Sequence, residues 1–330
     1  MTIDQLIGFL SQPRQICITT HTRPDGDAIG SSAALALLLR DMGHKAHLLL
    51  PNKAPAIFDF LPCYADVLCY DQQPDACLEA LAQAELIFIL DLNDYKRLEG
   101  LTLPIAQHTA PKILIDHHLG PQIEPDWAWC NPHISSTAEL VYQFMGLIGR
   151  HPYLTPPIAT CIYTGIATDT GRFKYNTQAN TLAVVSELLR CGLDMQHVNG
   201  QIFDRQTESQ LRLQGFCLYE RMTILPQYQA AYIALSTDDL TRFNFEDGDL
   251  EGVVNMPLSI DGINVSVLLA ERDDKIRLSL RSKGNLAINH IAQRYFAGGG
   301  HANAAGGTSY ASLPDTIAQM AAALARLYEK

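Results

Sequence analysis

Acidic side chains and histidines follow several apolar runs in the first half of the chain. These residues are His21, Asp25, Asp27, Asp91, Asp116, His117, His118 and Asp169. Carboxylate oxygens and imidazole nitrogens together suit Mn²⁺, and Mg²⁺ where oxygen dominates. So many anionic ligands would repel one another strongly without a cation, and they exceed what one metal ion needs. The set therefore predicts two metal ions that share a carboxylate, an arrangement that catalyses phosphoryl displacement by water.

Buried strands are expected to position these side chains. The continuous apolar runs that predict them are residues 16–20, 46–50, 86–92 and 112–116. Such runs are typical of strands buried on both faces of a parallel sheet. Residues 28–42, which are followed by Gly43, predict a helix between the first two strands. The pattern predicts a doubly wound α/β domain whose ligands lie beyond the carboxyl ends of its strands. We expect another strand end at Asp169, after the apolar run 159–167.

The second half of the chain has a different pattern. Residues 191–226 are polar and compatible with helix, so they predict a helical linker. Strands are predicted at residues 232–235, 263–270 and 275–282, and helices near residues 286–296 and 314–327. We therefore expect a catalytic domain over 1–190, the linker, and a smaller α/β domain over 227–330.

Composition excludes several classes of protein. The formal net charge of −11 argues against a broad basic surface that grips long duplex nucleic acid. No apolar run reaches the roughly 18–20 residues that span a bilayer, and the first residues do not resemble a secretion signal. The eight cysteines form no CxxC pair, so neither a zinc site nor a redox motif is indicated. We expect reduced thiols and a cytoplasmic protein without a membrane partner.

The order of the acidic and histidine motifs resembles that of the DHH phosphoesterases. The matching motifs are His21-x-x-x-Asp25-x-Asp27, Asp91, Asp116-His117-His118 and Asp169. Residues 281–285 (RSKGN) and 298–306 (GGGHANAAG) resemble the substrate-binding part of the DHHA1 domain. The resemblance covers nearly the whole chain. Length and layout are similar to the stand-alone bacterial nanoRNase/pAp-phosphatase proteins of the NrnA type, relatives of the RecJ exonucleases.

This resemblance implies roles for the first-domain residues. One metal ion would be held by His21, Asp25 and Asp91, and the other by Asp27, Asp91, His117 and Asp169. Asp91 would bridge the two ions, although Asp94 close behind it is an alternative. Asp116 would orient an imidazole from behind the ligands, and His118 would contact the scissile phosphate.

The resemblance also implies a substrate site in the second domain. The residues expected to bind substrate there are Arg281, Ser282, Lys283, Asn285, Gly299, Gly300 and His301. The glycines of 298–300 would let backbone N–H groups approach an anion that a Cβ atom would block.

The expected cofactor is a pair of Mn²⁺ ions, for which Mg²⁺ or Co²⁺ could substitute. Expected substrates are RNA or DNA oligonucleotides of about two to five nucleotides, hydrolysed to 5′-mononucleotides, or the nucleotide phosphate pAp. A homodimer is compatible with these expectations. A cyclic-dinucleotide phosphodiesterase and a catalytically inactive nucleotide-binding regulator remain alternatives.

Three features of the first domain also have structural interpretations. Asp27 could cap the helix that begins near Ala28. Residues 135–139 (SSTAE) predict a capping box that opens a helix, although they could also lie near the metal ligands. Arg97 could reach a phosphate, but a solvated position is favoured for it.

Overall fold

The structure is a computed structural model that describes residues 1–62 and 64–327, apart from the side chain of His301. Backbone contacts divide the chain into two units, Met1–Arg205 and Gln206–Lys330. We predicted a separate linker over 191–226, whereas the boundary between the units falls inside that segment, which is helical on both sides of it. No helix in the described part of the chain combines the length and apolarity needed to cross a bilayer.

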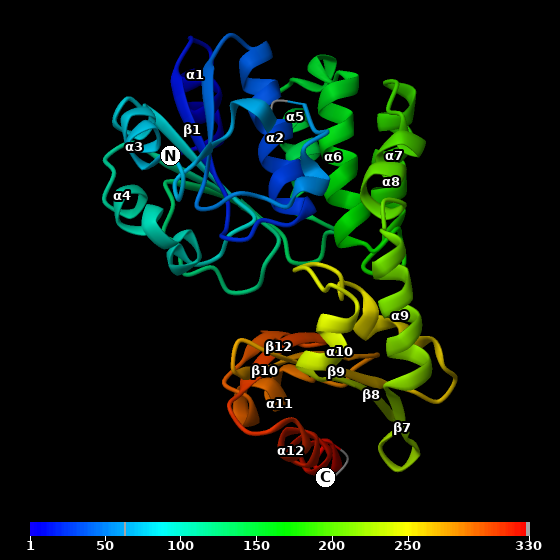
Figure 1. Ribbon diagram of the computed structural model, residues 1–330. Helices are drawn as coiled ribbons and strands as arrows, with labels where there is room; N and C mark the ends of the chain where they lie inside the picture. Colours follow the sequence, from blue (N-terminus) through cyan, green and yellow to red (C-terminus); the bar gives the residue numbers. More distant parts are fainter. Residues whose placement is uncertain (63, 328–330) are drawn as a thin grey trace. The chain divides into compact units, whose positions relative to one another are not determined.

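The first unit, coloured from blue to green in Figure 1, contains a sheet of six parallel strands in the order β3-β2-β1-β4-β5-β6. Its strands are β1 (Gln15–Thr19), β2 (Lys45–Leu50), β3 (Leu68–Cys69), β4 (Leu86–Leu90), β5 (Lys112–Asp116) and β6 (Trp127–Cys130). The predicted doubly wound parallel sheet is confirmed. We did not predict the two edge strands: β3 has only two residues, and the side chains of β6 are at most half-buried. Strand order reverses between β1 and β4, which is where ligands bind in such sheets.

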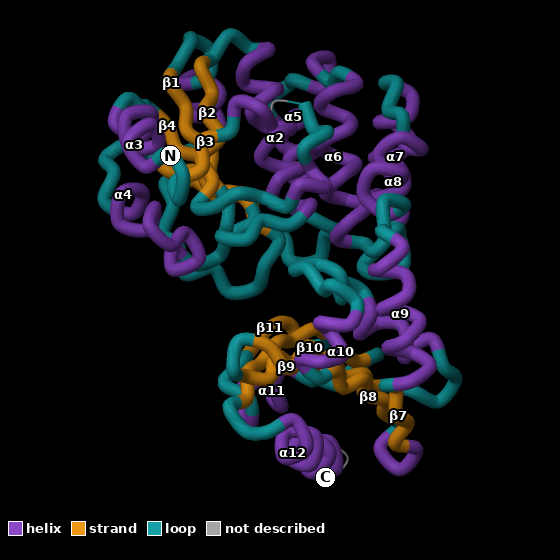
Figure 2. The backbone as a smooth tube through the Cα atoms, viewed as in Figure 1, coloured by secondary structure: helices purple, strands orange, loops and turns teal. Residues whose placement is uncertain are grey.

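Helices cover both faces of this sheet (Figure 2). They are α1 (Ile3–Phe9), α2 (Gly26–Asp41), α3 (Pro74–Ala82), α4 (Thr102–Ala106), α5 (Thr137–Leu147), α6 (Pro156–Asp169), α7 (Ala179–Arg190) and α8 (Met195–Phe203), with short 3-10 helices η1 (Ala56–Phe58), η2 (Tyr64–Asp66), η3 (Tyr95–Leu101) and η4 (His151–Tyr153). One apolar core joins α1, α2 and α5–α8 to the sheet, and a second core joins α3, α4 and η3 to the opposite face. Residues of β1 alternate between these cores, with Ile18 in the first and Cys17 in the second. Burial on both faces explains why the strands are continuously apolar.

The apolar run 159–167 is a helix, not the strand that we predicted. It forms most of α6, which packs closely against α2. A Cβ atom on Gly30 of α2 would lie 2.8 Å from the backbone nitrogen of Gly165 of α6, so the two glycines allow the helices to touch. A helix buried on most sides is apolar all round, and periodicity then cannot distinguish it from a buried strand. Asp169 therefore lies at the C-terminal end of a helix.

The second unit contains a mixed sheet in the order β11-β12-β10-β9-β8-β7, in which only β8 and β9 pair in parallel. Its strands are β7 (Met222–Leu225), β8 (Ala230–Leu235), β9 (Val265–Arg272), β10 (Lys275–Ser282), β11 (Gly299–His301) and β12 (Ala304–Ser309). Asp273 and Asp274 form the turn between β9 and β10, with φ angles of 52° and 56°. Two consecutive positive φ angles are typical of the type I′ hairpin turn.

Helices also cover both faces of the second sheet. They are α9 (Glu208–Glu220), α10 (Thr237–Arg242), α11 (Asn289–Tyr295) and α12 (Leu313–Ala325), with 3-10 helices η5 (Pro226–Tyr228) and η6 (Val253–Ser259). The core on one face contains residues of α11 and α12, and the core on the other contains residues of α9 and η6. The smaller α/β domain is thus confirmed. The glycine-rich segment 298–306 forms much of the β11–β12 hairpin.

Candidate metal centre

His21 lies just beyond the carboxyl end of β1 and is 4% exposed. Its Nδ1 donates a hydrogen bond to the backbone carbonyl of Thr22 at 2.8 Å. Because a carbonyl only accepts, the proton of the neutral ring is on Nδ1 and the lone pair is on Nε2. Nε2 lies 3.5 Å from Asp91 Oδ2 and 4.0 Å from Asp25 Oδ1. The ring is thus held in the tautomer that a metal ligand requires.

Two aspartates at the start of α2 have different surroundings. Asp25, not Asp27, caps α2, because Asp25 Oδ1 accepts from the backbone nitrogens of Asp27 and Ala28 at 3.1 Å each. Asp27 lies inside the first turn and is 1% exposed. Its Oδ2 accepts from the backbone nitrogen of Thr137 at 2.7 Å, and its Oδ1 accepts from that of Ala138 at 2.9 Å. Asp27 is therefore fixed by the N-terminus of α5 rather than by its own helix.

Asp91 occupies the centre of the cluster, directly after β4. It is 2% exposed, and its φ angle of 54° lies in the left-handed region that residues other than glycine seldom adopt. Such backbone strain is concentrated at functional sites. Asp91 Oδ2 faces His21, whereas Oδ1 faces His117. Asp94, our alternative bridging residue, instead caps η3 by accepting from Lys96 N at 2.9 Å.

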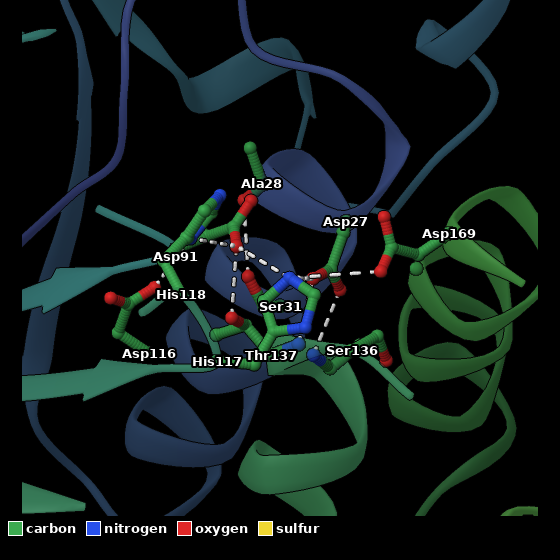
Figure 3. Close-up of polar contacts among 12 residues, drawn as sticks. Asp27, Ala28, Ser31, Asp91, Asp116, His117, His118, Ser136, Thr137 and Asp169 are labelled. Carbon is green, nitrogen blue, oxygen red and sulfur yellow. Dashed lines mark hydrogen bonds and ion pairs between the residues drawn. The ribbon is translucent and has the colours of Figure 1, made fainter. Parts of the chain in front are cut away.

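The two histidines after β5 turn different ring nitrogens toward the aspartates (Figure 3). His117 Nε2 lies 3.7 Å from Asp27 Oδ2, 3.5 Å from Asp91 Oδ1 and 3.6 Å from Asp169 Oδ2. His118 Nδ1 donates to Asp116 Oδ1 at 2.7 Å, and Asp116 is fully buried. Three segments distant in sequence thus bring a carboxylate to the ring of His117.

Burial and mutual repulsion shift the pKa values of these carboxyl groups. Burial raises the pKa of Asp27 well above its usual value, and the charges of Asp91 and Asp169 raise it further. Burial also raises the pKa of Asp169, to about 8, and the charges of Asp91 and Asp25 add to the effect. For Asp91 burial acts in the same direction, but the contact with His21 and the charges of the surrounding histidines outweigh it and lower the pKa.

The arrangement fits a divalent cation. Two ligand atoms that are each about 2.1 Å from one ion, at tetrahedral or octahedral angles, lie about 3.0–3.4 Å apart. The contacts of His117 Nε2, at 3.5–3.7 Å, are close to this spacing and too long for strong hydrogen bonds. Among the described residues, ligand atoms within 4.8 Å of one another form the groups His21-Asp25-Asp91, Asp27-His117-Asp169 and Asp91-His117-His118. A cation there would also remove the repulsion among the carboxylates.

A positive charge lies beside this cluster. Arg97 is half-buried, and its charge opposes protonation of both His21 and His118. Its backbone carbonyl accepts from the nitrogen of Thr22 at 2.7 Å, so the segment that carries it is attached to the loop after β1. The solvated position that we favoured for Arg97 stays a prediction.

In the second unit, the end of β10 and the loop that follows it carry four of the seven predicted substrate-binding residues. Ser282 is buried, and its hydroxyl donates to the carbonyl of Leu286 while it accepts from Asn303 Nδ2 at 2.9 Å. Asn303 also donates to the carbonyl of Gly284 at 3.0 Å. We did not single out Asn303 within GGGHANAAG, although it fixes this loop. The neighbouring Lys283 and Asn285 are exposed, as side chains that bind a ligand would be.

Strand packing explains why glycine occupies two of the positions 298–300. A Cβ atom on Gly298 would lie 1.9 Å from the carbonyl oxygen of Gly306, and one on Gly300 would lie 2.5 Å from that of Ala304. Close strand packing therefore excludes side chains at these two positions. Gly299 has more space, since its Cβ would meet only the side chain of Gln293, at 3.9 Å. The predicted His301 side chain lies outside the described residues.

Comparisons with known proteins agree with this architecture. The model of the DHH family, N-terminal domain, matches residues 15–166, and the model of the DHHA1 domain matches residues 226–330. A Thermus thermophilus protein named "Bifunctional oligoribonuclease and PAP phosphatase NrnA" is 31% identical over 89% of this chain and 83% of its own length. This chain belongs to the DHH/DHHA1 family. Our identification of the family from the sequence, and with it of a hydrolase, is confirmed.

Other DHH/DHHA1 relatives cover most of the chain as well. The Bacillus subtilis protein of the same name is 28% identical over 93% of each chain. A crystal structure of an exopolyphosphatase-related protein from Bacteroides fragilis superposes with a TM-score of 0.95 and 35% identity, over 98% of this chain and 95% of that one. A manganese-bound RecJ exonuclease shares the fold alone, with a TM-score of 0.54 and 15% identity over 99% of this chain and 95% of its own.

Proposed function

We propose that this chain is a two-metal phosphoesterase that hydrolyses short oligonucleotides, linear dinucleotides included, to 5′-mononucleotides and also removes a phosphate from pAp. The observation that carries the proposal is the position of Asp91. Its two oxygens face His21 on one side and His117 on the other, each at 3.5 Å. One carboxylate can thus belong to both ligand groups, as a bridging ligand does. The names of the Bacillus and Thermus relatives support the substrate class.

The site residues would hold two metal ions. Mn²⁺ is the metal that best suits their mixed oxygen and nitrogen donors. His21, Asp25 and Asp91 would hold one ion, and Asp27, Asp91, His117 and Asp169 the other. When bound, paired divalent cations stabilise the negative phosphoryl oxygens and lower the pKa of the attacking water.

Asp116 and His118 would act on the leaving group. Burial lowers the pKa of His118, but the hydrogen bond to Asp116 and the charge of Asp91 outweigh this effect and raise it. An imidazole whose Nδ1 is held by a buried carboxylate presents Nε2 as its proton donor. His118 would thus donate a proton from Nε2 to the leaving oxygen, while Asp116 stabilises the cationic ring.

In the second unit Arg281, Lys283 and Asn285 would bind substrate phosphates. The side chain of Arg281 is half-buried, and one of its nitrogens donates to the carbonyl of Leu280 at 3.0 Å. A guanidinium group can donate to two phosphate oxygens at once, which suits Arg281 to this role. The overall negative charge of the chain favours short substrates over long duplexes, because little of the surface can neutralise the phosphates of a long nucleic-acid backbone.

A substrate panel tests the proposal. Purified protein with Mn²⁺ is incubated with linear pApA, a dinucleotide RNA, pAp and cyclic-di-AMP, and the products are separated by chromatography. We expect AMP from linear pApA and from pAp, and no product with Asp91→Ala. Turnover of cyclic-di-AMP before linear pApA would favour the cyclic-dinucleotide phosphodiesterase. Substrate binding without turnover would favour the inactive regulator.

A further inference from the structure

The segment Ser135–Ser136–Thr137, which opens α5, is more than a helix cap. Ser136 is the N-cap of α5, since its hydroxyl accepts from the nitrogen of Glu139 at 3.1 Å. The predicted capping box is incomplete, however, because the carboxylate of Glu139 is used elsewhere. All of these side chains are buried, with exposed fractions of 1% or less. Buried polar groups at a helix start need partners, and the partners of Thr137 and Ala138 are carboxylates of the metal centre.

Thr137 donates to both Asp27 and Asp91. Its backbone nitrogen donates to Asp27 Oδ2 at 2.7 Å, and its hydroxyl donates to Asp91 Oδ1 at 2.9 Å (Figure 3). The neighbouring nitrogen of Ala138 donates to the other oxygen of Asp27 at 2.9 Å. These backbone nitrogens belong to the first turn of an 11-residue helix, where they have no helical partner and where the helix dipole favours an anion.

Glu139 fixes this helix start to a second helix. Its carboxylate accepts from the hydroxyl of Thr181 and the amide of Asn180, each at 2.8 Å, and from the hydroxyl of Ser135. Thr181 and Asn180 lie in the first turn of α7. The donors of Thr137 therefore belong to a rigid frame in which α5 and α7 start together. A donor held by such a frame can determine the orientation of a carboxylate.

We propose that Thr137 is a positioning residue that orients Asp27 and Asp91 for one of the two metal ions. The inference rests on the proposed two-metal function. Thr137 acts on Asp91 Oδ1, the oxygen that faces His117, whereas Oδ2 faces His21. Its backbone nitrogen acts on Asp27, which lies beside His117 as well. Thr137 thus supports the ion on the His117 side.

The hydroxyl fixes which lone pairs remain for the metal. Each carboxylate oxygen offers about two acceptor directions. The hydrogen bond from Thr137 occupies one direction of Asp91 Oδ1 and leaves the other for an ion. Without the hydroxyl, the Asp91 carboxylate could rotate, and its alignment with His117 would be lost. Removal of such a supporting partner typically lowers metal affinity or activity by about 10–100-fold.

The test compares Mn²⁺ binding to metal-free protein by titration calorimetry. The variants are Thr137→Val, which keeps the shape and the backbone donor, and Thr137→Ser, which keeps the hydroxyl. Thr164→Val is the matched control, because Thr164 is fully buried in α6 and its hydroxyl donates to the carbonyl of Thr160 within that helix. We expect Thr137→Val to weaken one of two binding events by about 10–100-fold. Thr137→Ser and the control should remain within about threefold of the wild type.

Two further variants identify the affected ion. In a His21→Gln background, which lacks a ligand of the other ion, Thr137→Val should still weaken the remaining event. In an Asp169→Asn background, which weakens the same ion, its additional effect should be much smaller, as expected for residues that act on one site. The opposite pattern would contradict the assignment to the His117 side.

Unchanged Mn²⁺ binding by Thr137→Val would overturn the inference, and so would equal weakening by Thr137→Ser. If Thr137→Val does not fold, as judged by circular dichroism, Thr137→Ala provides the same comparison with Thr137→Ser. The binding assay uses no substrate, so it is independent of the substrate assignment. A wild-type protein that binds both ions but hydrolyses no nucleotide would refute the proposed function. The titration would still decide whether Thr137 positions Asp27 and Asp91.

Discussion

Gly165→Ala would place a methyl group between the metal centre and the helix that supports it. The added Cβ would lie 2.6 Å from Asp27 Oδ1 and 2.4 Å from Cβ of Ala138. Ordinary contacts begin at 3.4 Å, so the carboxylate oxygen would have to move by about 0.8 Å. The nitrogen of Ala138 donates to that oxygen at 2.9 Å. Either this hydrogen bond breaks, or the start of α5 moves away with its donors.

The expected loss follows from that bond. A hydrogen bond to a charged group contributes about 1.5–3 kcal/mol, and about 1.4 kcal/mol corresponds to a tenfold change in an equilibrium constant. We therefore expect Gly165→Ala to weaken Mn²⁺ binding by about 10–100-fold. The free energy of unfolding should fall by about 1–3 kcal/mol through overpacking, offset by about 0.5–1 kcal/mol because alanine favours the helix.

Titration calorimetry with Mn²⁺ and urea denaturation of the metal-free protein measure the two effects. Gly200→Ala is the matched control, since Gly200 also lies inside a helix but no atom lies within 4 Å of its added Cβ. The control should bind Mn²⁺ as the wild type does and gain about 0.5–1 kcal/mol. If Gly165→Ala is destabilised yet retains wild-type Mn²⁺ affinity, the argument that this contact positions Asp27 is refuted.

Three further predictions concern the site. Asp91→Asn should lower hydrolysis of linear pApA by at least about 100-fold, because a shared ligand loses its charge, and a loss below tenfold in a product assay would contradict its bridging role. The pKa of His21 is raised, and that of Asp169 is raised from 3.8 to about 8; both shifts stabilise the metal-free fold at low pH, and this contribution is lost as pH rises through the folded values. Protein treated with EDTA should therefore lose Tm between about pH 4 and about pH 8 in a thermal melt, while the stabilisation by Mn²⁺ grows; a Tm of the metal-free protein that is independent of pH would contradict this. Lys283→Gln should raise KM for pApA without changing Mn²⁺ affinity, whereas Lys275→Gln at the opposite end of β10 should not, and equal KM values would exclude Lys283 from substrate binding.

Much of the fold could be predicted from the sequence because the central strands are buried on both faces. Continuous apolar runs therefore located β1, β2, β4 and β5 to within two residues at each end. The same criterion failed for α6, because a helix buried on most sides has no polar stripe to reveal its period. It also missed β6, whose side chains are at most half-buried. The glycine-rich segment concealed a hairpin, since glycine gives no strand signal.

The candidate metal ligands could be singled out because most of them follow strands at the switch point of the sheet, and the structure brings them together. Apart from Asp116, the residues that orient them could not be assigned that role from the sequence. Thr137 is close to Asp27 only because α2 and α5 pack together, and the two residues are far apart in sequence. The side chain of Asn303 alone fixes a loop that lies about 20 residues away in the sequence. Such contacts arise from tertiary packing, which no local pattern encodes.

Electron paramagnetic resonance of the Mn²⁺-loaded protein tests the central claim most directly, because two ions bridged by Asp91 would be magnetically coupled. Bridged pairs lie about 3.5–4 Å apart. We predict two Mn²⁺ ions per chain, with a coupled spectrum that Asp91→Asn converts to that of isolated ions. A single bound Mn²⁺, or two uncoupled ions in the wild type, would contradict the account.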